Sequence, residues 1–299
     1  MSSSHGIPHT LTGMPFRTKD ALKDGFPRFA LSSPTLSAPF RGIRSGLRAH
    51  DVVAQCEAYA LLMPGAHYFS HITAAQLWGL WLPSRFDGSE LHVTAPMPRR
   101  APRMAGVVGH KATTLLSEIV LDRGLPLVSP VDAWRQLASM LTIEELTEAG
   151  DSLVRRKHPQ ATQAQLGMAV SRHTGQRGVR TLRVALGQVR AGCDSPRETR
   201  LRVVLVTGGL PEPRVNAVVS RPGDPVRFGD LVYEEWLVMV EYDGLHHFSA
   251  TQRAADIDRL ERLRAEGWLI VTVVAAHFKD PGLIVARVEA ALRSRGWSR

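Results

Sequence analysis

Apolar and polar positions follow a regular pattern most clearly in the last third of the chain. Ser195, Pro196 and Glu198 form a capping box at the start of a helix, and Gly208 ends that helix. The pattern that follows predicts three strands, a helix, an apolar strand and a last helix, over residues 214–220, 226–233, 236–242, 250–265, 268–275 and 283–295. The predicted order is αβββαβα, which indicates an α/β fold class.

The front half carries shorter patterned segments. They predict helices over 51–63, 70–79, from 127 and over 143–157, and short strands over 91–94 and 106–110. Residues 1–40 are rich in Ser, Pro and Gly, so we expect them to be poorly ordered. A polar stretch after residue 157 is the best candidate boundary. We therefore expect a mixed α/β region over 41–160, a basic helical linker over 161–190 and a C-terminal domain over 191–299.

Charge changes this picture by suggesting a partner. The chain has 37 Lys and Arg against 28 Asp and Glu, a net charge of +9. Such an excess favours a polyanionic partner, with nucleic acid ahead of an anionic membrane surface. Cys56 and Cys193 show neither metal-ligand spacing nor a disulfide framework, which fits a reducing cytoplasm. No apolar run reaches the length of a membrane span, so we expect a soluble cytoplasmic protein.

One predicted strand runs from an apolar segment straight into acidic residues. Side chains alternate along a strand, so Glu241 and Asp243 share a face. A two- or four-residue hairpin would pair Asp230 with Met239 and place Asp230 diagonally from Glu241, at about 7–8 Å between Cα atoms. A three-residue loop would put the two acids on opposite faces. Three converging carboxylates are a site for a hard cation such as Mg²⁺ (or Mn²⁺).

Arginines crowd the stretch just ahead of these acids. Residues 172–202 contain eight of them, which favours a surface that follows the phosphates of duplex DNA. The candidate DNA contacts are Arg180, Arg183, Arg197, Arg200, Arg253 and Arg259. A pair of Arg259 with Asp256 is most often a surface ion pair, which is the alternative to a phosphate contact. We expect His92 and His110 to be structural, and an aromatic content of 6% does not favour a stacking platform for single strands.

The acids belong to a longer pattern: Asp230, Glu241-Tyr-Asp243-Gly244, His247, Arg253, Asp256, Arg259 and Gly267-Trp268. The pattern resembles a domain family of unknown function allied to very-short-patch-repair endonucleases. That family belongs to the PD-(D/E)XK restriction-endonuclease-like fold, whose core order αβββαβ agrees with the order predicted above. The resemblance covers about residues 178–299.

The resemblance implies metal-dependent hydrolysis of phosphodiester bonds in DNA, by an endonuclease that uses Mg²⁺ or Mn²⁺. Asp230 and Glu241 match the two strand acids of the family, and Glu198 matches its helix glutamate, which here either caps the helix or binds the metal. Asp243 stands where the family pattern has Lys. His247, or otherwise His246, would then act as the base or as a phosphate partner.

The front of the chain has a second resemblance, carried by four segments: residues 69–79, 92–96, 107–110 and 128–133. They are similar to abortive-infection antitoxin (AbiEi-like) domains, which precede this nuclease-like module in many proteins. A non-catalytic DNA-binding regulator of antitoxin type, built on a degenerate nuclease fold, is therefore the alternative function. A toxin or a repair protein would be the corresponding protein partner.

Overall fold

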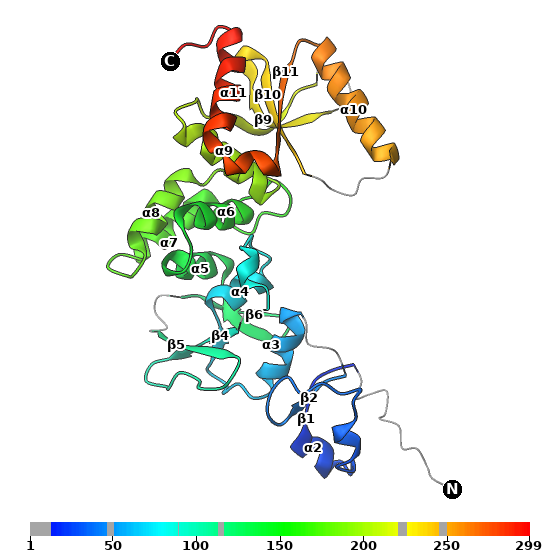
Figure 1. Cartoon of the computed structure of the whole chain (residues 1–299). Coiled ribbons are helices and arrows are strands. Elements are labelled where there is room, and N and C mark those ends of the chain that lie inside the picture. The colour runs from blue at the N-terminus through cyan, green and yellow to red at the C-terminus, as the bar shows by residue number, and fades with distance from the viewer. Residues whose placement is uncertain (1–12, 47–50, 89, 113–116, 221–225, 245–249) are drawn as a thin grey trace. The chain divides into compact units, whose positions relative to one another are not determined.

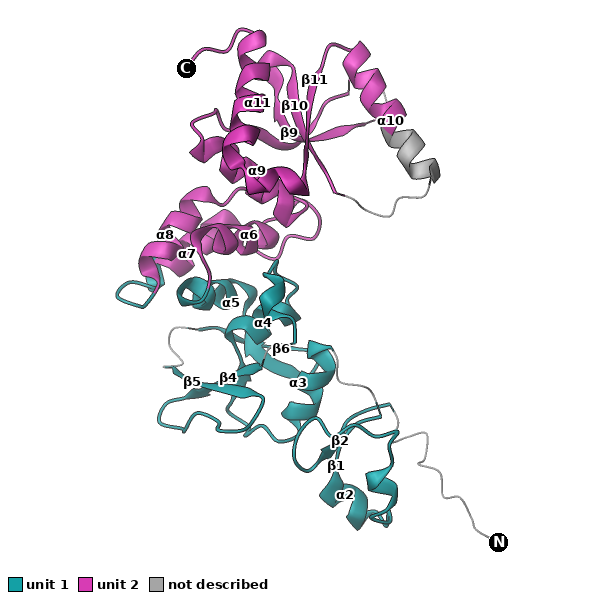
Figure 2. Ribbon diagram, in the orientation of Figure 1, with its two compact units in different colours: residues 1–140, 171–177 teal, residues 141–170, 178–299 magenta. Residues whose placement is uncertain are grey.

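The computed structural model describes residues 13–46, 51–88, 90–112, 117–220, 226–244 and 250–299, and the side chains of 250–256 lie outside the description. The chain forms two compact units (Figure 2). The first comprises residues 1–140 with 171–177, and the second comprises residues 141–170 with 178–299. Each unit has its own β-sheet and its own buried core.

The second unit is built on a four-stranded sheet of order β11-β10-β9-β8. Its strands are β8 (Arg214–Val218), β9 (Phe228–Tyr233), β10 (Val238–Asp243) and β11 (Leu269–Val274). β9 is antiparallel to β8 and β10, whereas β10 and β11 are parallel. The parallel pair requires a crossover, and α10 (Ala250–Ala265) supplies it.

Helices cover both faces of this sheet (Figure 1). α9 (Pro196–Thr207) and α11 (Pro281–Ser294) lie on one face, where Leu201 and Ile284 join a core with Leu231 and Val240. α10 covers the other face, where its Leu263 packs with a smaller cluster on the sheet. Alternating strand residues therefore enter two different cores, as the period of two requires.

The element order α9-β8-β9-β10-α10-β11-α11 confirms the predicted αβββαβα, and the chain is of the α/β class. Ser195 caps α9 as predicted, because its Oγ accepts the amide of Glu198 at 3.2 Å. Glu198 does not complete the box in the usual way. Its Oε2 accepts the amide of Asp194 at 2.9 Å, one residue before the cap.

The hairpin between β9 and β10 has a four-residue loop, Glu234 to Leu237. Leu237 adopts a left-handed conformation with φ of 50°, which turns the chain into β10. The predicted pairing of Asp230 with Met239 is wrong, because Met239 pairs with Val232. The loop is even-numbered, as the parity argument required, but it is centred one residue later than expected.

Three helices of the second unit precede α9 in the sequence. α6 (Ile143–Leu153) contacts both α8 (Val179–Gln188) and α9, while α7 (Gln163–Arg172) follows the turn after α6. The predicted boundary at residue 160 therefore lies within this unit, between α6 and α7. The polar sequence that suggested a linker reflects the exposed outer faces of α7 and α8.

The first unit contains a five-stranded sheet of order β5-β4-β3-β7-β6. The strands are β3 (Tyr68–Phe69), β4 (Leu91–Pro96), β5 (Val107–Ala112), β6 (Ile119–Asp122) and β7 (Leu125–Val128). α3 (Val52–Ala60), α4 (His71–Leu77) and α5 (Pro130–Gln136) accompany it. Ser129 caps α5 as the sequence predicts, although residues 127 and 128 belong to β7 rather than to the helix.

Residues 13–40, expected to be poorly ordered, instead contain secondary structure. β1 (Phe16–Arg17) pairs with β2 (Ile43–Arg44), and α2 (Thr18–Lys23) follows β1 directly. Composition underestimates the order here because Ala30, Leu31 and Phe40 are buried and supply a small apolar core. None of the described helices combines the length and apolarity needed to cross a bilayer.

Candidate functional site

Asp230 and Glu241 face each other across β9 and β10. Val240 pairs with Leu231 at the end of that ladder, and the next residues on the two strands are Glu241 and Asp230. Their side chains bridge the strands in place of backbone bonds: Asp230 Oδ2 accepts the amide of Tyr242 at 2.9 Å, and Glu241 Oε1 accepts the amide of Asp230 at 3.4 Å. The acids therefore lie closer together than the diagonal arrangement expected from the sequence.

Glu198 reaches the same region from the first turn of α9. Its Oε2 accepts the side-chain amide of Asn216 at 2.7 Å, and its Oε1 accepts the hydroxyl of Ser195 at 2.8 Å. The flanking pairs of the β8–β9 ladder place Asn216 beside Asp230. Asn216 has φ of 45°, a conformation that Asn tolerates better than most residues. The amide of Asn216 thus fixes the Glu198 carboxylate near the strand acids.

The three carboxylates interact electrostatically. Burial, and after it the negative charges of Glu241 and Glu198, raise the pKa of Asp230 to about 8. The Tyr242 amide and Arg259 oppose this shift but do not cancel it. Near neutral pH the cluster therefore holds a proton, which is what a group of like charges does when positive charge is in short supply.

Arg259 on α10 supplies a cation to this cluster. Its Nη2 donates to Glu241 Oε2 at 3.0 Å, and its Nη1 donates to the carbonyl of Phe228 at 3.2 Å. The sequence suggested that Arg259 contacts phosphate or pairs with Asp256. The structure places its guanidinium on a candidate metal ligand, so Arg259 neutralises part of the acid cluster. The side chain of Asp256 lies outside the described residues, so the pairing with Asp256 stays a prediction.

Among the remaining candidates near the acids, the structure describes the side chain of Asp243 alone. Asp243 ends β10 with an exposed side chain. His247 and His246 lie outside the described residues, as does the side chain of Arg253, although its backbone belongs to α10. The proposed roles of these residues stay predictions.

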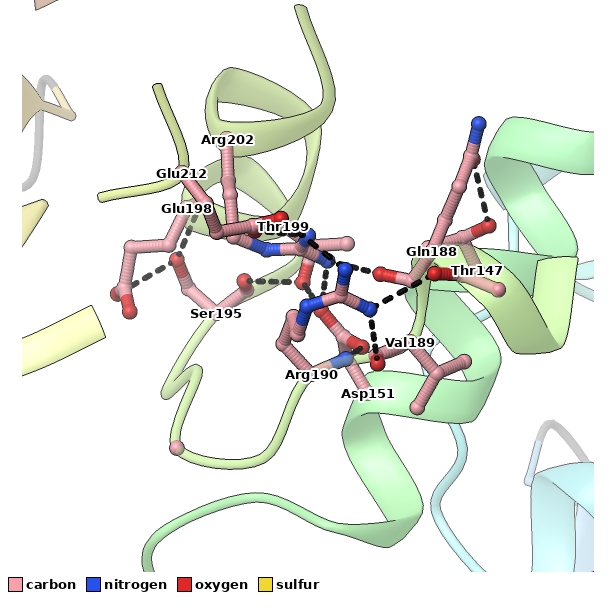
Figure 3. Close-up of polar contacts among 12 residues, drawn as sticks. Thr147, Asp151, Gln188, Val189, Arg190, Ser195, Glu198, Thr199, Arg202 and Glu212 are labelled. Atoms are coloured by element: carbon pink, nitrogen blue, oxygen red, sulfur yellow. Dashed lines mark hydrogen bonds and ion pairs between the residues drawn. The ribbon is translucent and has the colours of Figure 1, made fainter. Parts of the chain in front are cut away.

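The arginine-rich stretch divides into two groups. Arg180, Arg183, Arg197 and Arg200 are exposed, as a phosphate-binding surface requires. Arg202 is buried, and its Nη2 forms an ion pair with Asp151 at 3.0 Å (Figure 3). Arg202 and Arg190 also share Glu212, each at 3.0 Å. Arg190 and Arg202 therefore hold the helices together and do not belong to the outer basic surface.

The polar network of Figure 3 reaches back to the candidate site. Asp151 on α6 accepts the hydroxyl of Thr199 at 2.8 Å and the amide of Arg190 at 2.7 Å. Thr199 follows Glu198 directly on α9, so this buried network fixes the helix turn that carries the glutamate. Asp151 was not singled out by the sequence, because its partners lie 39 to 51 residues away.

A different set of residues forms the tightest group of potential metal ligands. Among the described residues, only His71, His92 and His110 bring three ligand atoms within 4.8 Å of one another. Glu198, Asp230 and Glu241 are therefore not assembled at that spacing. Burial lowers the pKa of His71 to about 2 and that of His92 to about 4. The sequence treated His92 and His110 as separate structural residues and did not single out His71.

The comparisons with known proteins give a likeness without an activity. The chain is similar to two proteins of Mycobacterium tuberculosis, uncharacterized protein MT2308 of strain CDC 1551 / Oshkosh and uncharacterized protein Rv2248 of strain ATCC 25618 / H37Rv. Each is 24% identical over 245 residues, which cover 80% of this chain and 86% of the relative. No protein-family model matches the chain, and no solved structure matches it significantly.

Proposed function

We propose that the second unit is a metal-dependent endonuclease domain that hydrolyses phosphodiester bonds in DNA. The observation that carries the proposal is the meeting of Asp230 and Glu241 at the end of their shared ladder, with Glu198 close enough to raise the pKa of Asp230. This arrangement is what the resemblance to the very-short-patch-repair and restriction-endonuclease-like families implies. The antitoxin-like nature of the first unit remains part of the same proposal.

The acid cluster suits a divalent cation. It offers carboxylate oxygens, which Mg²⁺ and Mn²⁺ prefer, and its retained proton indicates that it lacks positive charge. Asp230 and Glu241 would hold the metal, with Glu198 or Asp243 completing the set. When bound, Mg²⁺ or Mn²⁺ would polarise the phosphate and lower the pKa of an attacking water.

The chain's own residues then have separate roles. Asn216 orients Glu198, and the Tyr242 amide orients Asp230, so both carboxylates are held before any ligand arrives. Arg259, which donates to Glu241, would supply positive charge to a DNA phosphate bound at the cluster. His247 is the candidate base. Both cysteines are free and buried, and we infer a reducing, cytoplasmic location.

Cleavage of supercoiled plasmid DNA with Mg²⁺ or Mn²⁺ tests the proposal. We expect Glu241→Gln to lower the cleavage rate by about a thousandfold or more, because it keeps the shape of the side chain and removes a metal-binding charge. Glu144→Gln is the matched control, since Glu144 is an exposed acid on α6. Equal rates for the two variants would assign cleavage to another site or to a contaminant.

A second candidate function, a DNA-binding regulator without catalysis, is favoured by the Arg259–Glu241 ion pair. In a degenerate site, the guanidinium of Arg259 can supply the positive charge that a metal ion supplies in an active one. The regulator would be the better interpretation if wild-type protein binds DNA but does not cleave it with either metal across neutral pH.

DNA binding itself is tested by its salt dependence. Removing two exposed arginines, by Arg180→Ala with Arg183→Ala, should reduce the slope of log affinity against log salt by about 2. The double variant Arg264→Ala with Arg293→Ala removes the same charge from other exposed positions and should leave the slope nearly unchanged. Equal slopes in the two double variants would show that α8 does not contact the phosphates.

A further inference from the structure

Three imidazoles from separate elements meet in the first unit. His71 begins α4, His92 lies on β4, and His110 lies on β5. The parallel β4–β5 register pairs Thr94 with His110, so the two strand histidines lie diagonally on neighbouring strands. His92 Nδ1 and His110 Nε2 are 3.0 Å apart, and the rings of His71 and His110 stack at 3.8 Å between centroids.

The backbone at His71 is held in an unusual state. His71 has φ of 49°, a left-handed conformation that costs an ordinary residue about 1 kcal/mol or more. Its amide donates to the side-chain oxygen of Gln136 at 2.9 Å. Long-range contacts therefore stabilise a strained position that points this imidazole toward the other two.

Ser70 also helps to hold the His71 imidazole in position. It occupies the N-cap of α4, yet its hydroxyl makes no capping bond. Its Oγ instead lies 3.0 Å from His71 Nδ1 and accepts the hydroxyl of Thr94 at 2.7 Å. This chain fixes the His71 ring and leaves Nε2 as its metal-binding nitrogen. A polar group on the far nitrogen of a histidine is the usual support of a histidine that binds a metal.

We propose that His71, His92 and His110 form a Zn²⁺ site, separate from the acid cluster of the second unit. Three imidazole nitrogens suit a borderline divalent transition metal and not Mg²⁺. His71 and His110 keep partial exposure, so water can reach the fourth position of a tetrahedral ion. A bound ion would join the start of α4 to both strands, in addition to the backbone bond from the Ser70 amide to the His92 carbonyl.

The fit requires only a small closure. Zn–N distances of about 2.0–2.1 Å place the nitrogens of a tetrahedral site about 3.4 Å apart. The His92–His110 contact is already that short, whereas the full set spans up to 4.8 Å. Rotation of the partly exposed His71 and His110 rings by about 1 Å at their nitrogens would close the difference.

Titration of the metal-free, full-length chain with Zn²⁺ tests the site. We expect one Zn²⁺ per chain, a higher thermal unfolding temperature of the Zn²⁺-bound protein, and X-ray absorption that reports histidine ligands at about 2.0–2.1 Å. Affinity should fall at least about tenfold in Ser70→Ala and be lost in His92→Gln with His110→Gln. His67→Gln, which changes a buried histidine outside the cluster, is the matched control.

Glu241→Gln distinguishes the histidine site from the carboxylate site, because it should leave the Zn²⁺ affinity of the three histidines unchanged. Where the double histidine variant does not fold, the X-ray absorption of the wild-type protein decides. The proposal would be overturned if Zn²⁺ does not bind, or if the X-ray absorption shows mainly oxygen ligands. It would also be overturned if the double variant Ser70→Ala with His92→Gln binds Zn²⁺ as tightly as wild type. The three histidines would then be a structural stack of neutral imidazoles.

Discussion

The carboxylate of Asp230 is the point where the interactions of the acid cluster converge. It accepts the amide of Tyr242 and faces Glu241, and the negative charge of Glu198 contributes to its raised pKa. Its neighbours on β9 enter the two apolar cores, so water around it is limited. A carboxyl group in this position binds a proton or a metal because either removes the uncompensated negative charge.

The raised pKa of Asp230 has a consequence for stability. The folded state keeps this proton up to about pH 8, whereas the unfolded chain loses it near pH 3.8. Between these values the folded state binds more protons, so stability falls as pH rises through the window. Asp230→Asn keeps an oxygen for the Tyr242 amide and cannot ionise, so the variant should escape this loss.

We therefore expect Asp230→Asn to match wild type near pH 4 and to gain on it by up to about 1.4 kcal/mol per pH unit until about pH 8, above which the gap is constant. Urea unfolding at a series of pH values, without divalent metal, measures the difference. Asp258→Asn changes an exposed acid on α10 and should show no such gap. A wild type that gains stability relative to Asp230→Asn as pH rises would contradict the assignment.

At the scale of elements, the β9–β10 hairpin sets the geometry of the site. Its four-residue loop brings Asp230 opposite Glu241, and Gly229 allows β9 to approach the core there. A Cβ at Gly229 would lie 2.3 Å from Met239 Sδ and 2.9 Å from Val232 Cγ2, and both side chains are buried. The absence of a side chain next to Asp230 is therefore a packing requirement.

Gly229→Ala should destabilise the protein by about 1–3 kcal/mol, because the added methyl group overpacks the smaller core. It should also weaken Mn²⁺ binding, since a displaced β9 carries Asp230 with it. Thermal unfolding and calorimetric titration give the two measurements. Gly187→Ala, at an exposed position of α8 with open space around it, should instead stabilise by about 0.5–1 kcal/mol. Similar unfolding temperatures in the two variants would contradict the packing argument.

At the scale of the whole molecule, the buried ion pair of Arg202 with Asp151 joins the sheet-bearing part of the second unit to α6. Both side chains are almost fully buried, and Glu212 and the carbonyl of Gln188 also accept from the guanidinium. Removing one partner of such a pair leaves an uncompensated buried charge, which costs about 3–5 kcal/mol. The four-stranded sheet of the second unit therefore depends on helices that precede it in the sequence.

A fragment of residues 191–299, the domain expected from sequence, should consequently be less stable than a fragment of residues 141–299. We expect the longer fragment to unfold cooperatively and the shorter one to be largely unfolded or to melt at a far lower temperature. Circular dichroism during thermal unfolding compares them. Equal unfolding temperatures would show that α6 and α8 are dispensable for the sheet.

Local signals in the sequence determined the elements of this protein. Periodicity, the Ser195 and Ser129 caps and the glycine stops predicted the order αβββαβα, because these signals act within a few residues of one another. Alternation along a strand predicted that Asp230 and Glu241 share a face only with an even-numbered loop, and the structure has a four-residue loop. Charge and composition suggested a polyanionic partner, and the candidate contacts Arg180, Arg183, Arg197 and Arg200 are exposed.

Only the tertiary structure decided the register of the acids, the burial of Arg202, the support of Glu198 by Asn216, and the meeting of the three histidines. Each joins residues between 10 and 51 positions apart, as in Arg202 with Glu212 and with Asp151. Such contacts follow from how helices and strands pack, and no local pattern records them. The sequence therefore determined which elements form, and the packing of those elements decided which side chains can act together.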